Sequence, residues 1–124
     1  MSAGALAVDA VAAAEAIVLV TPIYKAAYSG LLKLFLDLLP QFALTDKVVL
    51  PLATAGSPAH VLALDYALRP VLSSLGVRHA EAGFVVLERQ IEILPGGPGL
   101  ETETAEKLRP FLDAFTDSLR RHAR

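Results

Sequence analysis

Cysteine is absent from the 124-residue sequence, and its absence removes several kinds of chemistry at once. Disulfide bonds, thiolate metal sites and cysteine nucleophiles are all excluded. Histidine does not supply a metal site either, because no two of His60, His79 and His122 stand at the spacing of metal ligands. No serine lies in the pattern of a nucleophile elbow, so a serine hydrolase is a poor fit. We therefore expect neither a metal site nor a dedicated nucleophile.

Strong charge of one sign and long apolar runs are also missing. The net charge is -2 and the pI is about 5.9, so the chain has no basic surface for nucleic acid and no polybasic membrane patch. No apolar run reaches the roughly 18 residues that cross a bilayer. Residues 1–16 are rich in alanine, but they lack a positive start and include Asp9 and Glu15, unlike a signal peptide. We expect a cytoplasmic protein that binds neither nucleic acid nor membrane.

Apolar residues are plentiful. They make up 54% of the sequence, and the mean hydropathy of +0.51 is high for a soluble monomer. A chain of this length forms one domain, which we place over residues 1–124. Part of its apolar surface is expected to meet another chain, as in a homodimer or homotetramer.

Residues 16–33 predict a strand, a loop and a helix in succession. Ala16–Thr21 is a short apolar, β-branched run typical of a buried parallel strand, and it ends where proline removes a ladder donor. Pro22 to Tyr28 forms an apolar and aromatic loop, and Ser29 is a good N-cap for a helix over Gly30–Leu39. Ligands of open α/β sheets bind beyond the carboxyl ends of the strands, so this loop stands where a flat aromatic cofactor would be held. Ordinary turn chemistry is the alternative interpretation.

The same succession of strand, loop and helix recurs along the chain. Lys47–Thr54 predicts a second buried strand, which is followed by the turn Ala55-Gly56-Ser57 and by a helix that runs to about Leu75. Ala80–Leu87 predicts a third strand. The remaining expectations are helices over residues 3–14 and from about Glu101, and a mobile loop over residues 89–99. Strands that alternate with helices indicate an α/β protein with a parallel sheet.

A proline inside the third helix predicts an irregularity there. Pro70 cannot donate to the carbonyl of Tyr66, and its ring crowds that carbonyl. We expect a kink or a single π-type turn across Tyr66–Pro70, of the kind often found at functional positions. Asp65 and Arg69 stand four residues apart on the same helix and are expected to form an ion pair.

Two motifs resemble a known family. TPIYKAAYSGLLKLFLDLLP and, further on, VVLPLATAGSPAHVLALDYALRPVLSSLG are similar to segments of the NADPH-dependent FMN reductase family. The branch most similar to them is the flavin reductase of alkanesulfonate two-component monooxygenase systems. The resemblance covers residues from about Ala12 to Gly83.

The resemblance implies a flavodoxin-like three-layer α/β/α fold with a parallel sheet. This chain would hold strands 3, 4 and 5 of the strand order 2-1-3-4-5. The family opens with a strand and a Ser-rich phosphate-binding loop, and the sequence shows no counterpart of either. Ala16–Thr21 is then expected to present an uncovered apolar edge, so that either the protein is longer or the chain pairs with another.

The resemblance also implies the cofactor and its contacts. FMN would be bound, with NADPH or NADH as the hydride donor, and no catalytic side chain is required because hydride passes directly to the flavin. The residues expected to bind the cofactor are Thr21, Pro22, Ile23, Tyr24, Lys25, Tyr28, Ser29, Ala55, Gly56 and Ser57. In the similar branch, a tyrosine on a π-helical insertion lies at a subunit interface near the flavin. Tyr66 matches it, so Tyr66 and Pro70 are expected at an oligomer interface.

Two functions follow from these observations. The first is an NAD(P)H-dependent FMN reductase that supplies reduced flavin to a flavin-dependent monooxygenase. The second is a truncated, non-catalytic flavodoxin-like remnant that keeps an oligomerisation surface and a weak flavin pocket. The two differ in whether the chain binds FMN with useful affinity.

Overall fold

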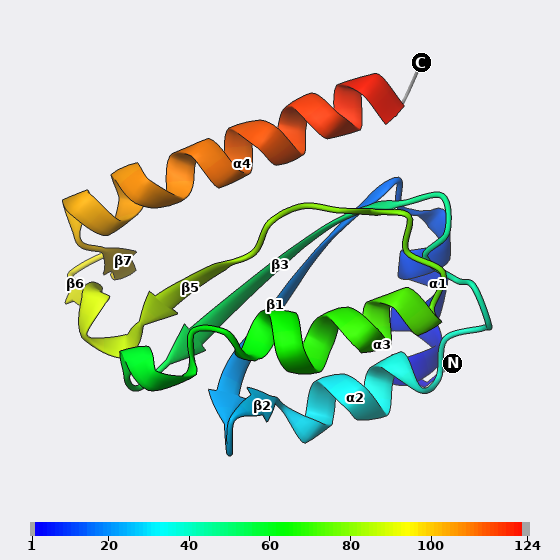
Figure 1. Ribbon diagram of the computed structural model, residues 1–124, viewed down its shortest axis with the longest axis horizontal. Helices are drawn as coiled ribbons and strands as arrows, with labels where there is room; N and C mark the ends of the chain where they lie inside the picture. The colour runs from blue at the N-terminus through cyan, green and yellow to red at the C-terminus, as the bar shows by residue number, and fades with distance from the viewer. Residues whose placement is uncertain (1, 123–124) are drawn as a thin grey trace.

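The computed structural model describes residues 2–122. Its main sheet has helices on both faces, with α2 and α3 on one side and α4 on the other (Figure 1). The elements in chain order are α1 (Ala3–Ala13), β1 (Ala16–Tyr24), β2 (Ala27–Tyr28), α2 (Gly30–Leu36), β3 (Val48–Ala55), η1 (Pro58–His60), η2 (Leu64–Leu68), α3 (Arg69–Ser74), β4 (His79–Ala80), β5 (Phe84–Leu87), η3 (Glu88–Gln90), β6 (Ile91–Leu94), β7 (Gly97–Leu100) and α4 (Thr102–His122). The predicted α/β class is confirmed.

Strand β3 is the centre of the sheet. It pairs in parallel with β1 on one side, from Ala16 opposite Val48 to Pro22 opposite Thr54. On its other side it pairs in parallel with β4 and then with β5. Strand β2 joins antiparallel to the end of β1, so the order is β2-β1-β3 followed by β4 and β5. The predicted strands therefore lie side by side and parallel.

The main core lies between the sheet and the helical layer made of α2, η2 and α3. Val49 and Ala53 of β3 meet Leu36, Leu68 and Leu72 there, all essentially inaccessible to solvent. On the opposite face, α4 packs against β3 and β5, and the ring of Phe111 stands edge-on to that of Phe84 with centroids 5.0 Å apart. Since both faces of β3 are covered, its apolar run is explained by burial on two sides.

Strand β1 is longer than predicted. It passes through Pro22 to Tyr24 and turns back into β2, so the expected loop over residues 22–28 is a β-hairpin. Lys25 and Ala26, between the strands, have φ angles of 51° and 64°, the left-handed conformation that both central residues of a type I′ turn need. Proline fits in β1 because, among the described residues, Ala16–Pro22 has a strand neighbour on one side only.

The third predicted strand is divided, and a proline in its neighbour explains the division. Pro51 of β3 has no N–H to donate, and it lies between the stretch that pairs β4 and the stretch that pairs β5. Gly83, between β4 and β5, packs tightly against Pro51. A Cβ added to Gly83 would be 2.9 Å from the carbonyl oxygen of Pro51 and 2.8 Å from Leu64 Cδ1. The continuous strand expected over Ala80–Leu87 is wrong for this reason.

The helix expected between residues 57 and 75 contains the predicted irregularity. A π-helical turn occupies Leu64–Leu68, with Tyr66 at its middle, and the N–H of Arg69 donates to the carbonyl of Leu64 five residues earlier. The π-type turn is confirmed, two residues earlier than expected. Pro70 then stands in the first turn of α3, where a missing N–H is tolerated.

Two further expectations are corrected. Helix α2 ends at Leu36, and tighter turns carry the chain on to Leu39. Residues 89–99 do not form an irregular loop, since β6 and β7 form an antiparallel hairpin in which Gly97 has a φ of 123°. Within residues 2–122, no helix is long and apolar enough to cross a membrane.

Candidate functional site

The carboxyl ends of strands β1, β3 and β5 lie together along one end of the sheet, which we call the carboxyl edge (Figure 1). Each strand leads there into a different connection: the hairpin to β2, the turn at Gly56, and the short helix η3. Parallel sheets bind ligands at this edge because the loops that follow the strands converge there. The edge is therefore the candidate functional site.

Thr21 ties the hairpin to the start of α2. Its side chain is fully buried, and its hydroxyl donates to the carbonyl of Pro22 at 2.8 Å while it accepts from the N–H of Ser29 at 2.9 Å. Ser29 in turn caps α2, since its Oγ accepts from the N–H of Leu32 at 3.1 Å. The predicted cap is confirmed. These bonds hold both ends of the hairpin against the helix N-terminus.

The side chains of the hairpin differ in how far they are exposed to solvent. Ile23 and Tyr28 lie opposite each other across β1 and β2, are half-buried and pack against the main core. The side chain of Tyr24 is 62% exposed, and Lys25 is exposed beside it. Tyr24 and Lys25 are thus free to meet a ligand, whereas Ile23 and Tyr28 support the hairpin from below.

The turn after β3 is open where the sequence has glycine. Ala55 is buried, while Gly56 and Ser57 are exposed. A Cβ added to Gly56 would meet only the Oε2 atom of Glu88, at 3.9 Å, so the folded chain itself does not require glycine here. Ser57 starts the next turn, and its Oγ accepts from the N–H of Ala59 at 3.4 Å. The backbone of this turn is accessible from outside.

Glu88 was not among the predicted site residues. It opens η3 directly after β5, and η3 is held by a 2.8 Å hydrogen bond from the N–H of Leu87 to Gln90 Oε1. The end of β5 could have indicated it, because the reasoning applied to the ends of β1 and β3 holds equally for a third parallel strand. Its carboxylate, near Gly56, adds negative charge to this part of the edge.

Tyr66 lies near the hairpin. A hollow of about 160 Å³ joins the two parts, and its walls are Ala26, Ala59, His60, Leu62, Ala63 and Tyr66. The side chain of Tyr66 is 77% exposed and Pro70 is also exposed. The structure thus brings the predicted interface tyrosine to the predicted cofactor hairpin, whereas Pro70 lies outside the hollow.

Arg69 fixes the junction between the π-helical turn and α3. Its Nε pairs with Asp65 Oδ1 at 2.7 Å, which confirms the expected ion pair. One of its terminal nitrogens also donates to the carbonyl of Glu81 at 2.9 Å. The same side chain therefore links this helix to the segment between β4 and β5.

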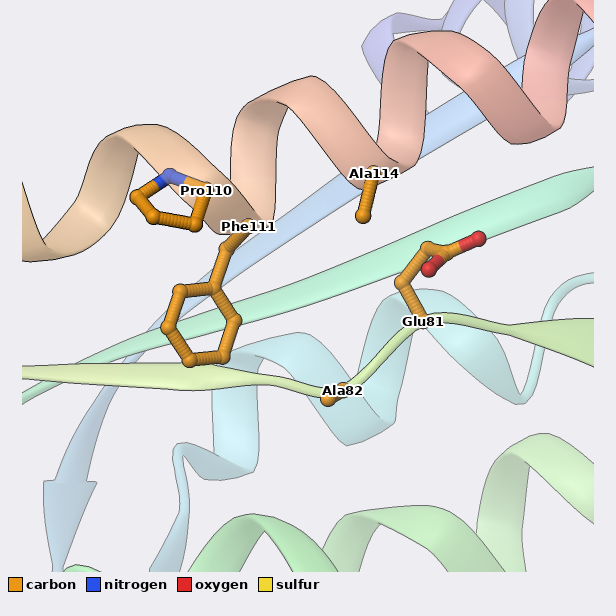
Figure 2. Close-up of a pocket in the computed structure, with 5 residues that line it drawn as sticks. All are labelled: Glu81, Ala82, Pro110, Phe111 and Ala114. Atoms are coloured by element: carbon orange, nitrogen blue, oxygen red, sulfur yellow. The ribbon is translucent and has the colours of Figure 1, made fainter.

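A second cavity lies away from the carboxyl edge. Figure 2 shows it between α4 and the segment that joins β4 to β5. It has a volume of about 210 Å³, and its walls are Glu81, Ala82, Pro110, Phe111 and Ala114. The Glu81 carboxylate lies 3.2 Å from the ring of His79. Within residues 2–122 no three His, Cys, Asp or Glu side chains gather as metal ligands would.

The fold and this edge define a flavodoxin-like α/β protein, in which an anchored aromatic hairpin and an open glycine turn flank the ends of parallel strands. Residues 3–92 match the family described as NADPH-dependent FMN reductase. The chain belongs to this family.

Known relatives support the assignment and are longer than this chain. FMN reductase (NADPH) of Pseudomonas putida strain KT2440 is 44% identical over 116 residues, which are 92% of this chain and 59% of the relative. FMN reductase (NADPH) of Escherichia coli K12 is 45% identical over 108 residues, 87% of this chain and 56% of the relative. The solved apo structure of the NADH:FMN oxidoreductase EMOB superposes with a TM-score of 0.82 at 52% identity, covering 93% of this chain and 59% of that one. The chain thus spans somewhat more than half the length of each.

Proposed function

We propose that this chain forms the flavin-holding part of an NAD(P)H-dependent FMN reductase. The open backbone at Gly56, beside a hairpin anchored by Thr21, is the observation on which the proposal rests. Bound FMN would supply the hydride acceptor, so the protein has to bind and orient two flat ligands and needs no side chain as acid or base.

Distinct tasks are proposed for the two sides of the site. Tyr24 and Lys25, both exposed, contact the flavin from the hairpin. Ala55-Gly56-Ser57 approaches it with backbone groups, and the absence of a Cβ at Gly56 permits the close approach. Thr21 and Ser29 position the hairpin without a required ligand contact. Pro22, Ile23 and Tyr28 complete the proposed cofactor-binding set: they are half-buried, and they contribute by holding the hairpin beneath the flavin and by whatever part of each side chain is accessible.

The nicotinamide donor is NADPH or NADH, since the names of the relatives include both. We infer a flavin-dependent monooxygenase of the sulfonate type as the consumer of reduced FMN, on the resemblance of the two motifs. We also place the protein in the cytoplasm, as a homodimer or homotetramer that uses Tyr66 and Pro70 at a subunit contact. The exposure of both side chains is consistent with such a contact.

A non-catalytic flavodoxin-like module is the alternative. Val18 and Val20 of β1 are 46% and 62% exposed, which leaves part of the sheet uncovered among the described residues. A chain that served only in assembly would keep such a surface but bind FMN weakly. Flavin binding therefore separates the two functions.

An FMN titration of the 124-residue chain is the direct test. Saturable quenching of flavin fluorescence at micromolar FMN, with NADPH or NADH oxidation in the same cuvette, is the expected result. Absence of quenching from a folded chain would refute the proposal and leave the assembly module. Riboflavin should bind within about threefold of FMN if this chain does not hold the phosphate, because a phosphate site contributes more than that ratio.

The glycine at position 56 provides the sharper variant. Gly56→Val places a side chain in the open space without an internal clash, so FMN affinity should fall at least tenfold while the melting temperature stays unchanged. Gly4→Ala, in α1 away from the carboxyl edge, is the matched control and should leave affinity unchanged. Equal FMN affinity for Gly56→Val and the unmodified chain would contradict the proposed contact.

A further inference from the structure

Glu88 lies directly beside Gly56 because β3 and β5 end in register. These strands end next to each other at the carboxyl edge (Figure 1). Their last pair joins Ala55 to Leu87, so Gly56 and Glu88 are each the first residue beyond the paired stretch. A Cβ added to Gly56 would lie 3.9 Å from Glu88 Oε2. The Glu88 carboxylate therefore borders the open space over the glycine turn.

Main-chain hydrogen bonds hold Glu88 at this place. Leu87, which precedes it, is buried, and the N–H of Leu87 donates to Gln90 Oε1 at 2.8 Å. The carbonyl of Glu88 accepts from the N–H of Ile91, which closes the short helix η3. The side chain of Glu88 is exposed to solvent. Its backbone is thus fixed, and its carboxylate is accessible to a ligand.

The charge of Glu88 is not neutralised by a neighbour. In the part of the chain that the structure describes, no lysine, arginine or histidine forms an ion pair with it. The ion pairs of that part involve other acidic residues, which are Asp37, Asp65, Glu81, Glu103 and Asp117. A carboxylate without a cationic partner imposes a negative potential on whatever lies over the adjacent turn.

The reaction of a flavin reductase changes the charge of the ligand at this turn. A hydride carries one proton and two electrons, so a C–H bond of the dihydronicotinamide breaks, an N–H bond of the flavin forms, and the flavin ring gains one negative charge. The phosphate of FMN keeps its charge throughout. A fixed negative charge beside the ring therefore repels reduced FMN more than oxidised FMN, whereas its effect on the phosphate is the same for both.

We propose that Glu88 lowers the affinity of the site for reduced FMN relative to oxidised FMN, and so promotes release of the product. This role rests on the proposed function, in which reduced flavin has to leave the reductase for a separate monooxygenase. Glu88 acts through its charge and transfers no proton. At a separation of several ångströms in a partly solvated site, one unit charge changes the ratio of the two affinities by about three- to tenfold.

Glu88→Gln tests this role because it removes the charge and keeps the shape of the side chain. Anaerobic isothermal titration calorimetry of the 124-residue chain compares oxidised FMN with FMN reduced by light and EDTA. The dissociation constant of reduced FMN, divided by that of oxidised FMN, should fall by about threefold or more. Glu88→Asp retains the charge and should keep the ratio of the unmodified chain within about twofold.

Asp117→Asn is the matched control. It removes one negative charge from an exposed position of α4. Asp117 lies near the end of α4 where His122 contacts Asp46, which precedes β3, so it is remote from the carboxyl edge. The ratio of the two dissociation constants should not change in this variant.

The midpoint potential of the bound flavin and its salt dependence give a second readout. A threefold change in the ratio corresponds to a rise of about 14 mV for a two-electron couple. The difference between Glu88→Gln and the unmodified chain should shrink to less than about twofold near 1 M salt, where the Debye length is about 3 Å. A purely structural role of Glu88 would not depend on salt in this way.

The possible outcomes separate this inference from the proposed function. An unchanged ratio in Glu88→Gln, with oxidised FMN still bound, would overturn the inference alone. Equal weakening of both forms would show that the carboxylate accepts a hydrogen bond from the flavin, and would overturn it as well. If the folded, unmodified chain does not bind oxidised FMN, the proposed function fails and this inference fails with it.

Discussion

Strands β1 and β3 are neighbours with similar apolar sequences, yet their surroundings differ greatly. In β3, Val48, Val49 and Leu50 are fully buried, because strands flank it on both sides and helices cover both faces. In β1, Val18 and Val20 are largely exposed, because α4 lies over β3 and β5 instead. An apolar, β-branched run therefore predicts a strand, but it does not say how much of that strand the same chain covers.

The difference also separates stability from function within the sheet. The well-covered strand β3 contributes most to the core and supplies only a backbone turn to the candidate site. The poorly covered strand β1 leads into the hairpin that carries the exposed Tyr24. Substitutions in the two strands should therefore have different consequences.

The largest change in the free energy of unfolding is expected for a substitution in the buried strand β3. Leu50→Ala removes a fully buried side chain from β3 and should lower the free energy of unfolding by about 2–5 kcal/mol. Val20→Ala in β1 should change it by less than about 0.5 kcal/mol, since its side chain is mostly exposed. Urea denaturation followed by circular dichroism measures both. Similar losses for the two variants would mean that β1 is covered in solution.

The close crossing beside β3 comes next. Gly83→Ala brings a Cβ within 2.9 Å of the Pro51 carbonyl and should destabilise the chain by about 1–3 kcal/mol. Gly30→Ala is the control, since no atom lies within 4 Å of its added Cβ. Thermal unfolding compares the two variants. An unchanged melting temperature for Gly83→Ala would show that β4 and β5 shift easily around the proline.

A smaller difference in stability is expected between the loss of the Thr21 hydroxyl in β1 and the loss of the Thr54 hydroxyl in β3. Thr21→Val keeps the shape of the side chain but leaves the N–H of Ser29 without its acceptor, at a cost of about 1–2 kcal/mol. Thr54→Val, at a half-exposed position of β3, should cost less than about 0.5 kcal/mol. If the hairpin position matters for FMN, Thr21→Val should also weaken flavin binding. Equal stability of both variants would remove Thr21 as the anchor of the hairpin.

The smallest effect on stability is expected at the exposed part of β1. Val20→Lys should change the free energy of unfolding by less than about 0.5 kcal/mol, yet it should slow aggregation, because charges on an edge strand oppose strand addition. Light scattering during incubation at constant protein concentration reports the rate. Leu112→Lys on α4 serves as control. Equal protection by both lysines would indicate a general effect of charge rather than the open edge of β1.

Short-range signals in the sequence predicted much of the structure. Apolar runs located the parallel strands, Ser29 and Ser57 marked two helical starts, and Pro70 indicated the π-type turn. Each of these depends on residues close in sequence, whose backbone preferences or hydrogen bonds are local. The candidate site was located from the same signals, because strand ends are local features.

Features that depend on distant contacts were missed. The turn at Lys25 and Ala26 places two non-glycine residues in the left-handed region, where a hairpin is normally signalled by Asn-Gly. The division between β4 and β5 depends on Pro51, about thirty residues earlier in the chain. The leucines of residues 31–39 form one wide apolar face in the sequence, and only the packing shows that Leu36 and Leu39 are buried while Leu31, Leu34 and Leu38 are exposed.

Helix α4 covers one face of the sheet, and it is synthesised after the strands that it covers. Among the described elements it is the last in chain order, and it lies over the face of the sheet opposite α2 and α3 (Figure 1). The ring of His122, near its end, contacts the carbonyl of Asp46, which precedes β3 by two residues. On the ribosome, the strands and the other helices emerge first, and one face of β3 stays bare until α4 has left the exit tunnel. The nascent chain is therefore most exposed to chaperones and to misassembly in the interval between the synthesis of β5 and that of α4.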